Sequence, residues 1–360
     1  MTQRENFRCM MSGRPYDHVP LDLPMTPPMV DEMERRLGTR DAVRAFELDF
    51  GYVSGGSFGD ASRWRGEYEK RAVPIPEGAW VGDGGNVEKP GDTASVGASY
   101  HLTEMFHPLS HSTTLEEVQS FPWHDLDDPA LNAPLKDSVD AVITEGRVST
   151  ISLECTVFES AWYLRGMEQL FADLIEENGI ADWLLDRFAE QSARTAVAAA
   201  QAGVDLVRLG DDVGTQRGMM MSVAFWRKHL KPRLHRVVKA TKEVNDPPYV
   251  QYHSDGDVSE IVDDLIEIGV DIFNPVQPEC MPLDGVAARW TDRLAFSGMI
   301  GTQTTMPFGS SCEVQEAVGT CEKWIRRGAR MIIAPTHVIE PDVPWSNVIA
   351  LAEAVRRIRP

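Results

Sequence analysis

The sequence predicts an α/β protein that folds as a (β/α)8 TIM barrel with an inserted irregular or β-rich segment near its N-terminal part. Short apolar runs alternate with longer helical patterns along the 360 residues, as expected for a parallel sheet covered by helices. The phrases Ala202-Gly-Val-Asp205 and Ile268-Gly-Val-Asp271 repeat one junction, in which a glycine ends a helix in a left-handed cap and a strand follows. Two copies of this junction favour repeated helix-to-strand units and therefore a barrel.

The apolar runs number eight, which is the strand count of such a barrel. The expected strands cover residues 18–22, 46–50, 149–154, 205–209, 249–252, 271–274, 294–297 and 331–334. The clearest helical patterns cover residues 166–178, 180–202, 223–245, 258–268, 312–327 and 345–358. We therefore expect residues 1–360 to form a single barrel domain.

Residues 51–134 interrupt this alternation. The segment is rich in Gly, Pro and Trp and shows no long helical period. It is too long for a plain connection, so we expect an insertion with short strands of its own that covers the mouth of the barrel.

The composition excludes several classes of function. The chain is 42% hydrophobic and 25% charged, as in ordinary globular proteins, and its formal charge of −20 argues against nucleic acid or anionic lipid as a partner. No apolar window is long enough to span a membrane, and the N-terminal residues are polar. The five cysteines form no CxxC pair, which favours free thiols in a reducing compartment. We expect a soluble cytoplasmic protein that acts on a small molecule.

Polar side chains stand where nearly every predicted strand ends. The most informative example is Tyr249-Val-Gln-Tyr-His-Ser-Asp-Gly256, a β-type run that stops on a histidine, a carboxylate and a glycine. In a parallel barrel, the carboxyl ends of the strands face the active site, so these groups should converge there. Other polar groups at or just after strand ends are Asp22, Glu154, Asp211, Asp212, Asn274, Gln277, Gln303 and His337.

His253 and Asp255 are the leading candidates for metal ligands or for an acid–base pair. They are two residues apart, so in a continued strand both side chains point to the same side. His337, which ends the last strand, is a natural second imidazole, and two imidazoles with a carboxylate suit zinc or another divalent ion. Alternatively, His253 forms hydrogen bonds within a loop and Asp255 shapes the turn before Gly256.

Three further carboxylates are candidates for catalysis. Asp211 and Asp212 follow a buried strand directly, and adjacent like charges would poise one of them as a proton carrier or as a cation ligand. Helix capping with solvent exposure is the alternative for this pair. Glu154, at the end of its strand, is predicted to transfer protons or to support the metal ligands.

A substrate pocket is expected around these groups. Arg165 could bind a substrate carboxylate through its planar guanidinium, or could form a salt bridge at a helix start. Cys280, on a loop after a strand, is a candidate for a reactive or metal-bound thiol. The remaining polar side chains expected to contact the substrate are Gln216, Asn274, Gln277 and Gln303.

Five segments carry a resemblance to a known family. Residues 159–166, 210–216, 252–256, 274–278 and 335–344 resemble the uroporphyrinogen decarboxylase superfamily, especially its branch of cobalamin-linked methyltransferase-like proteins. The resemblance covers most of the chain and implies a (β/α)8 barrel. It also implies a possible homodimer and a corrinoid carried by a partner protein.

The sequence departs from the superfamily at two places. True uroporphyrinogen decarboxylases carry an arginine-rich segment after the first strand, whereas residues 21–27 here contain no arginine. The methyltransferases that this chain resembles hold zinc with a His-x-Cys pair and a further cysteine. His253 matches the histidine, Asp255 stands where the first cysteine would be, and His337 lies close to the third position. Such a set of ligands is harder and favours oxygen donors.

The leading hypothesis is a metal-dependent methyltransferase or demethylase that moves a methyl group between a small methylated substrate, a corrinoid protein and an acceptor. A metal-free carboxy-lyase, in which His337 or an aspartate stabilises a protonated intermediate, is the alternative. A binding protein without catalytic activity is a third hypothesis.

Overall fold

Seven parallel strands form the central sheet of the computed structural model, which describes residues 1–360 except 56–60, 72, 74, 83 and 91–102. Every neighbouring pair in the sheet is parallel, and the strand order follows the chain. The strands in this order are β1 (Phe50–Val53), β5 (Val148–Glu154), β6 (Leu206–Gly210), β9 (Tyr249–His253), β10 (Ile272–Asn274), β11 (Ala295–Ser297) and β12 (Met331–Ile332). The predicted α/β class and barrel fold are confirmed.

The first predicted strand contributes only one bridge. Leu21 pairs in parallel with Ile333, just after β12, and the Asp22 backbone N–H donates to the Ile333 carbonyl at 3.1 Å. On the other side, side chains link this segment to β1, because the Tyr52 hydroxyl donates to Asp22 at 2.6 Å. The segment around Leu21 therefore occupies the eighth position of the barrel.

The predicted strand at 46–50 is wrong in its position. Residues Ala42–Phe46 form helix α3, which begins where the Asp41 side chain accepts a hydrogen bond from the Arg44 backbone N–H. Glu47 then adopts a left-handed conformation, with φ of 48°, and ends the helix. The helix, capped at Asp41 and at Glu47, takes up the first residue of the apolar run at 46–50, so the strand starts only at Phe50.

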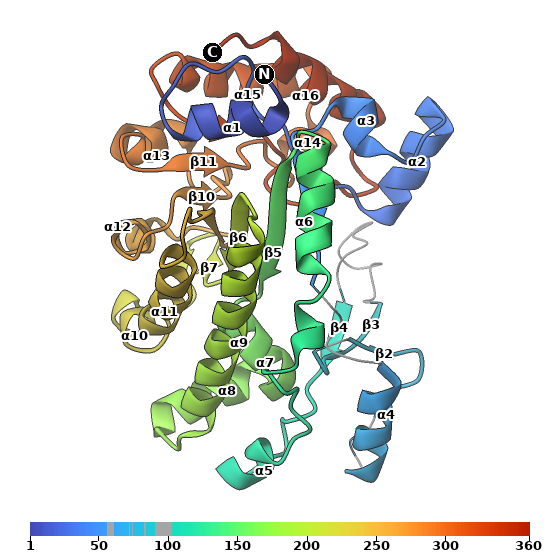
Figure 1. Cartoon of the computed structure of the whole chain (residues 1–360), viewed down its shortest axis with the longest axis vertical. Helices are drawn as coiled ribbons and strands as arrows, with labels where there is room; N and C mark the ends of the chain where they lie inside the picture. Colours follow the sequence, from blue (N-terminus) through green and yellow to red (C-terminus); the bar gives the residue numbers. More distant parts are fainter. Residues whose placement is uncertain (56–60, 72, 74, 83, 91–102) are drawn as a thin grey trace.

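Helices cover the outside of the barrel, and most lie where the sequence predicts them (Figure 1). Gly203 and Gly269, with φ of 95° and 100°, end helices as expected. The pattern at 223–245 forms two helices, because Pro232 lacks a backbone N–H and is tolerated only in the first turn of the second one. The helices that follow the strands are α6 (Leu135–Thr144), α7 (Phe158–Arg165), α8 (Met167–Glu176), α9 (Ile180–Ala202), α10 (Val223–His229), α11 (Lys231–Lys242), α12 (Val262–Glu267), α13 (Leu283–Trp290), α14 (Thr305–Phe308), α15 (Ser311–Ile325) and α16 (Trp345–Arg357).

The N-terminal helix α1 (Gln3–Met11) covers the end of the barrel where the strands begin. Its Phe7, Met10 and Met11 pack against the apolar residues that begin the strands, including Leu206 of β6. Helices α2 (Pro27–Leu37) and α3 follow the segment around Leu21. The site must therefore lie at the opposite end, where the strands finish.

The expected insertion contains a small antiparallel sheet and several short helices. These elements are α4 (Ala61–Lys70), β2 (Trp80–Val81), β3 (Val87–Pro90), β4 (Thr103–Phe106), α5 (Leu115–Gln119) and a 3₁₀ turn at Pro129–Leu131. The segment lies against α7, which follows β5, and the Leu109 backbone N–H donates to the Leu164 carbonyl at 2.8 Å. In Figure 1, these elements lie beyond the carboxyl end of β5. The covering of the mouth stays a prediction, because part of the insertion lies outside the described residues.

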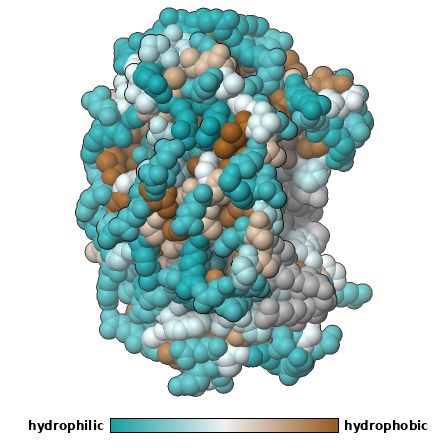
Figure 2. Space-filling view, in the orientation of Figure 1, coloured by the Kyte–Doolittle hydropathy of each residue, from teal (hydrophilic) through white to brown (hydrophobic). Residues whose placement is uncertain are grey.

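The surface matches the acidic composition. Hydrophilic residues cover most of the face in Figure 2, and the apolar residues on it form small separate patches. None of the described helices is both long and apolar enough to cross a bilayer.

Candidate metal centre

His253 lies at the end of β9 and at the centre of the polar groups that finish the strands. In the register of the sheet, it stands opposite Gly210 of β6 and Asn274 of β10. A Cβ atom on residue 210 would lie 2.7 Å from the Cβ of His253, so the glycine leaves the space that the imidazole needs. The strand pairing therefore places this ring at the inner rim of the barrel.

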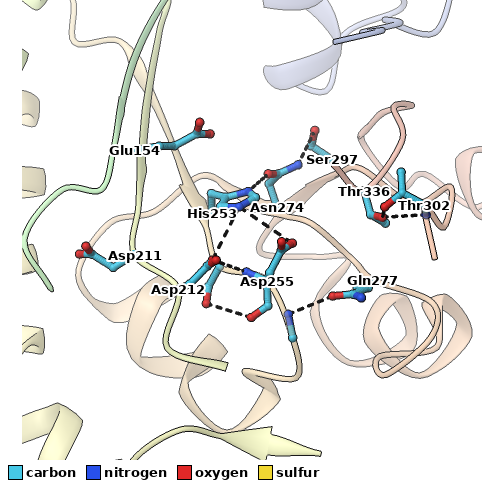
Figure 3. Close-up of polar contacts among 12 residues, drawn as sticks. Glu154, Asp211, Asp212, His253, Asp255, Asn274, Gln277, Ser297, Thr302 and Thr336 are labelled. Atoms are coloured by element: carbon cyan, nitrogen blue, oxygen red, sulfur yellow. Dashed lines mark hydrogen bonds and ion pairs between the residues drawn. The ribbon is translucent and has the colours of Figure 1, made fainter. Parts of the chain in front are cut away.

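Asp212, His253 and Asp255 form a three-residue cluster (Figure 3). The His253 Nε2 atom lies 3.8 Å from Asp212 Oδ1 and 4.0 Å from Asp255 Oδ1. One potential ligand atom from each residue lies within 4.8 Å of the other two. The Asp255 backbone N–H donates to Asp212 Oδ1 at 2.7 Å and joins the two loops that carry the carboxylates. The structure thus brings together two of the predicted ligands and adds Asp212 as the third.

Asn274 fixes the orientation of the imidazole. Its side-chain oxygen lies 2.6 Å from His253 Nδ1, and its side-chain nitrogen donates to Ser297 Oγ at 3.2 Å. An amide that donates to the serine presents its oxygen to the ring, so Nδ1 carries the proton and Nε2 turns its lone pair towards the two aspartates. Metal-binding histidines are commonly held by such a partner.

Acidic neighbours change the titration of His253. Burial opposes the charged form, but the carboxylates of Glu154, Asp255 and Asp212 outweigh this effect and raise the pKa of His253. Three carboxylates around one imidazole form a concentrated negative field, which would attract a proton or a metal cation.

The loop after β9 is held by close backbone contacts. Gly256 has a φ of 83°, and a Cβ atom there would lie 2.6 Å from the Thr215 backbone nitrogen. The Gly256 N–H donates to the buried side-chain oxygen of Gln277 at 2.9 Å, and the Gln277 nitrogen lies 3.4 Å from the side-chain oxygen of Gln216. Gln277 and Gln216 therefore position the loop of Asp255, and their contact with a substrate stays a prediction.

The donor set suits a divalent cation. Two carboxylate oxygens and one imidazole nitrogen are ligands for zinc and for harder divalent metals. A tetrahedral ion with bonds of about 2.0–2.2 Å holds its ligand atoms roughly 3.3–3.6 Å apart. The 3.8 and 4.0 Å distances from His253 Nε2 to the two carboxylates lie a few tenths of an ångström above this range, and all three ligand atoms lie within 4.8 Å of one another. Asp212 and Asp255 are partly exposed, which leaves access from the mouth.

The two adjacent aspartates have different roles. Asp211 is buried and accepts hydrogen bonds from the backbone N–H groups of Val157 and Glu159, at 3.1 and 2.9 Å. Burial and the neighbouring Glu159 raise the pKa of Asp211 well above its usual range. The Asp211 side chain therefore caps helix α7 and is not one of the three cluster residues, and its catalytic role stays a prediction. Of the alternative, helix capping is confirmed, whereas the expected solvent exposure is wrong because Asp211 is buried.

Glu159 is a site residue that the sequence analysis did not single out. Its carboxylate accepts from the Asp212 backbone N–H at 2.9 Å and from the Tyr163 hydroxyl at 3.1 Å. Burial and the charge of Asp212 raise the pKa of Glu159 to about 7. A glutamate in the first turn of a helix is common because its charge interacts favourably with the helix dipole. Nothing in the sequence therefore distinguished Glu159 as a site residue.

Glu154 contacts an arginine from the neighbouring strand. Its Oε1 lies 3.1 Å from an Nη2 atom of Arg208, and its Oε2 accepts from the Ser152 hydroxyl at 3.1 Å. Burial raises the pKa of Glu154, but Arg208 and the nearby histidines outweigh it, so that the net pKa is lowered. The lowered pKa favours the ionised carboxylate, and the predicted roles of Glu154 in proton transfer or in support of the metal ligands stay predictions.

His337 lies beside the cluster without joining it. Its ring centroid is 6.4 Å from that of His253, with an angle of 53° between the rings. Among the described residues, the group with metal-ligand spacing contains Asp212 in the place expected for His337. Its ligation of the metal stays a prediction.

Arg165 forms a buried ion pair and hydrogen bonds to two backbone carbonyls. Its side chain is buried, and Nε donates to Asp173 at 2.7 Å while Nη1 donates to the carbonyls of Leu109 and Ser112. The guanidinium therefore ties α7 to α8 and to the insertion. The alternative of a salt bridge is confirmed, and the contact of Arg165 with a substrate stays a prediction.

Two further predicted residues, Cys280 and Gln303, are not part of the cluster among the described residues. Burial raises the pKa of the Cys280 thiol to about 11, and this thiol contacts the Gln277 carbonyl at 3.7 Å. Burial of this kind disfavours the thiolate form, which is the nucleophile and metal ligand. The reactive or metal-bound role of Cys280 stays a prediction. Gln303 is exposed, and its backbone N–H donates to Glu279.

Comparisons with known proteins place the chain in a family. A model of the uroporphyrinogen decarboxylase (URO-D) family matches residues 96–358. A search of curated proteins found no match.

One solved structure shares the fold over nearly the whole chain, and two others show weaker likeness. A methyltransferase from Methanosarcina mazei has 17% sequence identity and a TM-score of 0.66, with 99% of this chain and 98% of that chain covered. A B12-independent methionine synthase from Shewanella sp. W3-18-1 has 12% identity, coverage of 63% and 66%, and a TM-score of 0.43. A putative B12-independent methionine synthase from Listeria monocytogenes has 10% identity, coverage of 95% and 96%, and a TM-score of 0.44. The first likeness supports the barrel fold over the whole chain, and the family match, over most of its length, shows that the protein belongs to the uroporphyrinogen decarboxylase family.

Proposed function

We propose that this protein is a metal-dependent methyltransferase or demethylase. It would move a methyl group between a small methylated molecule, a corrinoid carried by a partner protein, and an acceptor. The observation that carries the proposal is the cluster of Asp212, His253 and Asp255, whose ligand atoms converge at the mouth of the barrel. The likeness of fold to a methyltransferase supports the same reading.

The residues around the cluster have distinct tasks in this proposal. Asp212, His253 and Asp255 would hold a divalent metal such as zinc, which when bound acts as a Lewis acid on an oxygen or another donor atom of a ligand. Asn274 keeps Nε2 of the imidazole available, and Glu159 orients the loop of Asp212 through its backbone N–H. The oxygen-rich donor set leaves more positive charge on the metal than thiolates would, which favours oxygen-bearing ligands over thiol activation.

Metal analysis of protein purified without chelator tests the cluster. Wild-type protein is expected to contain about one divalent metal per chain, because one site has this geometry among the described residues. His253→Ala and Asp255→Asn should reduce the content severalfold. His235→Ala, which alters an exposed histidine on α11, is the matched control and should keep the metal. Wild-type protein without stoichiometric metal would contradict the proposal.

A second assay separates methyl transfer from decarboxylation. The family match leaves a metal-free carboxy-lyase as the alternative, although residues 21–27 contain no arginine and Asp22 is engaged by Tyr52. Spectroscopic detection of methylcobalamin, with free reduced cobalamin as methyl acceptor, would support the transferase if chelation abolishes it. Release of carbon dioxide that survives exhaustive chelation would favour the lyase instead.

A further inference from the structure

A cavity lies at the amino end of the barrel, whereas the metal cluster lies at the carboxyl ends of the strands. It is formed between the end of α1 and the residues that join α15 to β12. Its volume of about 310 Å³ falls within the range of roughly 300–1,000 Å³ that small-molecule sites occupy. The residues that line it include Met10, Tyr16, Ile325 and Pro360, together with Arg14 and Arg330.

The two arginines of this cavity are anchored at neighbouring residues. Arg330 Nη1 donates to the Met11 carbonyl at 3.1 Å, and Arg14 Nε donates to Ser12 Oγ at 2.9 Å. Met11 and Ser12 are consecutive, so their Cα atoms are only about 3.8 Å apart. Burial raises the pKa of the Tyr249 hydroxyl, and the charges of both arginines oppose this rise. Both guanidinium groups therefore lie in the same small region beside the cavity.

Other basic residues at the amino end of the barrel have carboxylate partners. Arg4 and Arg8 donate to Asp205 at 2.8 and 2.9 Å, and Lys242 pairs with Asp271. Among the described residues, neither arginine of the cavity has such a partner. Acidic residues are plentiful in a chain with a formal charge of −20, and the lack of one here leaves two positive charges in the cavity.

The unpaired donors of the cavity are accessible. Arg14 is exposed, and Arg330 and Tyr16 are partly buried. Apart from the two bonds that anchor the arginines, the guanidinium N–H groups and the Tyr16 hydroxyl have no hydrogen-bond partner in the described part of the chain. The unpaired atoms of Arg330 and Tyr16 are not shielded from solvent. A ligand in the cavity can therefore reach all three side chains.

Two guanidinium groups and a hydroxyl favour a phosphate group as the ligand. The planar fork of arginine donates paired hydrogen bonds to phosphate or carboxylate oxygens. A phosphate monoester carries a charge of about −1.5 to −2 near pH 7, which matches two arginines better than the single charge of a carboxylate. The side chains of Met10 and Ile325 offer apolar contacts to an organic group. The acidic surface opposes nucleic acid and anionic lipid, which leaves a small molecule.

We propose that Arg14, Arg330 and Tyr16 bind the phosphate group of a small organic phosphate monoester at the amino end of the barrel. The site is separate from the metal cluster and does not depend on the function proposed for it. The ligand would contact the loop after α1 and the residue before β12. It would therefore stabilise the packing of α1 against the barrel.

Calorimetric titration with phenyl phosphate and phenyl sulfate tests the site. The two probes have similar shapes, but at about pH 8 the phosphate carries about two negative charges and the sulfate about one. Wild-type protein should bind about one phenyl phosphate per chain, and about tenfold more tightly than phenyl sulfate. Phenyl phosphate should also raise the melting temperature, because it binds the folded protein. No binding at millimolar concentration, or equal affinity for the two probes, overturns the proposal.

Substitution of the arginines distinguishes a ligand site from a structural role. Arg14→Gln should weaken phenyl phosphate about tenfold or more, because charge-assisted hydrogen bonds are lost from an exposed residue. Arg330→Lys keeps the charge but loses the planar fork and should weaken the probe a few-fold. Arg217→Gln alters an exposed arginine in the hairpin of β7 (Gly214–Thr215) and β8 (Gly218–Met219), and this matched control should keep wild-type affinity. A lowered melting temperature of Arg14→Gln with unchanged affinity would mean that the arginine only supports the end of α1, and would overturn the proposal.

A further control separates this cavity from the metal cluster, where a phosphate oxygen is also a good metal ligand. His253→Ala removes a proposed metal ligand and should bind phenyl phosphate as wild type does. Loss of affinity in His253→Ala, with retention in Arg14→Gln, would assign the phosphate to the cluster and overturn the proposal. A protein that proves to hold no metal would leave the titration valid, and a failed titration would leave the metal analysis valid.

Discussion

At the scale of single residues, the site depends on which atom each side chain presents to the cluster. His253 turns Nε2 to the aspartates because Nδ1 is engaged by Asn274, which is itself held by Ser297. These hydrogen bonds connect side chains from three neighbouring strands, β9, β10 and β11, so the register of the sheet fixes the direction of the imidazole. The orientation that the proposed metal site requires is therefore set by the fold itself.

Asn274→Leu tests this orientation. The substitution removes the acceptor for Nδ1, so the ring loses its fixed tautomer and metal affinity should fall by about 10–100-fold. Competition with a chromogenic chelator measures the affinity. Asn274→Asp retains an oxygen acceptor and should stay within a few-fold of wild type. Equal affinity for Asn274→Leu and wild type would show that the amide does not orient the ligand.

The sequence predicted part of this cluster and missed the rest for a geometric reason. His253 and Asp255 could be found because a strand and a loop of known direction carry them at a spacing of two. Asp211 and Asp212 are adjacent and follow the last residue of β6, so strand alternation no longer says which one faces the site. Hydrogen bonding decides it, because the start of α7 binds Asp211 and leaves Asp212 for the cluster.

At the scale of elements, the junction of α7 and α8 depends on one buried ion pair. Arg165 ends α7, and Asp173 accepts from it and from the side chains of Gln169 and Asn178 at 2.9–3.0 Å. Burial raises the pKa of Asp173, but these hydrogen bonds outweigh it and lower the pKa. The helix that carries Glu159 is thus held at its far end by a carboxylate outside the site.

Asp173→Asn should lower the free energy of unfolding by about 3–5 kcal/mol at neutral pH, because Arg165 is left buried without its counter-charge. The pKa of Asp173 is lower in the folded state, so its contribution is present above the unfolded value of about 3.9 and is lost as the pH falls through the folded value. Urea denaturation at decreasing pH should therefore show the wild type approaching the variant. Asp292→Asn, on the exposed surface, is the control. A pH-independent difference would contradict the ion-pair account.

Element boundaries show where local signals compete with periodicity. The glycine-capped junctions at Gly203 and Gly269 were predictable because a left-handed cap needs that residue type. The break between α10 and α11 also had a signal, Pro232, but the apolar period continues through it. The start of β1 was misplaced because the apolar run at 46–50 does not reveal that Phe46 belongs to a capped helix.

At the scale of the whole molecule, the barrel interior is divided into an apolar end and a polar end. Residues that begin the strands pack with α1, whereas Arg208, Gln251 and His253 line the end where the strands finish. The alternation of apolar runs and helices predicted the barrel. It could not predict that one strand shortens to a single bridge at Leu21, because the closure depends on side-chain contacts such as that of Tyr52 with Asp22.

This division predicts that the two ends respond independently to mutation. Phe7 of α1 is fully buried and makes edge-to-face contacts with Phe50 and Tyr249, with ring centroids 5.8 and 5.6 Å apart. Phe7→Ala should lower the free energy of unfolding by about 3–5 kcal/mol, because it removes a large buried side chain and leaves a cavity. Urea denaturation measures this change. Phe308→Ala, at a residue that is 79% exposed, should change it by no more than about 0.5 kcal/mol.

The folded Phe7→Ala protein should still contain wild-type metal, because α1 touches the amino ends of the strands and the cluster lies at their carboxyl ends (Figure 1). Metal analysis well below the unfolding temperature checks this expectation. Metal loss without unfolding would show that the packing of α1 at the amino ends of the strands affects the geometry of the cluster at their carboxyl ends. Retention of the metal together with lowered stability would establish that α1 stabilises the barrel while the ends of β6, β9 and β10 alone set the geometry of the site.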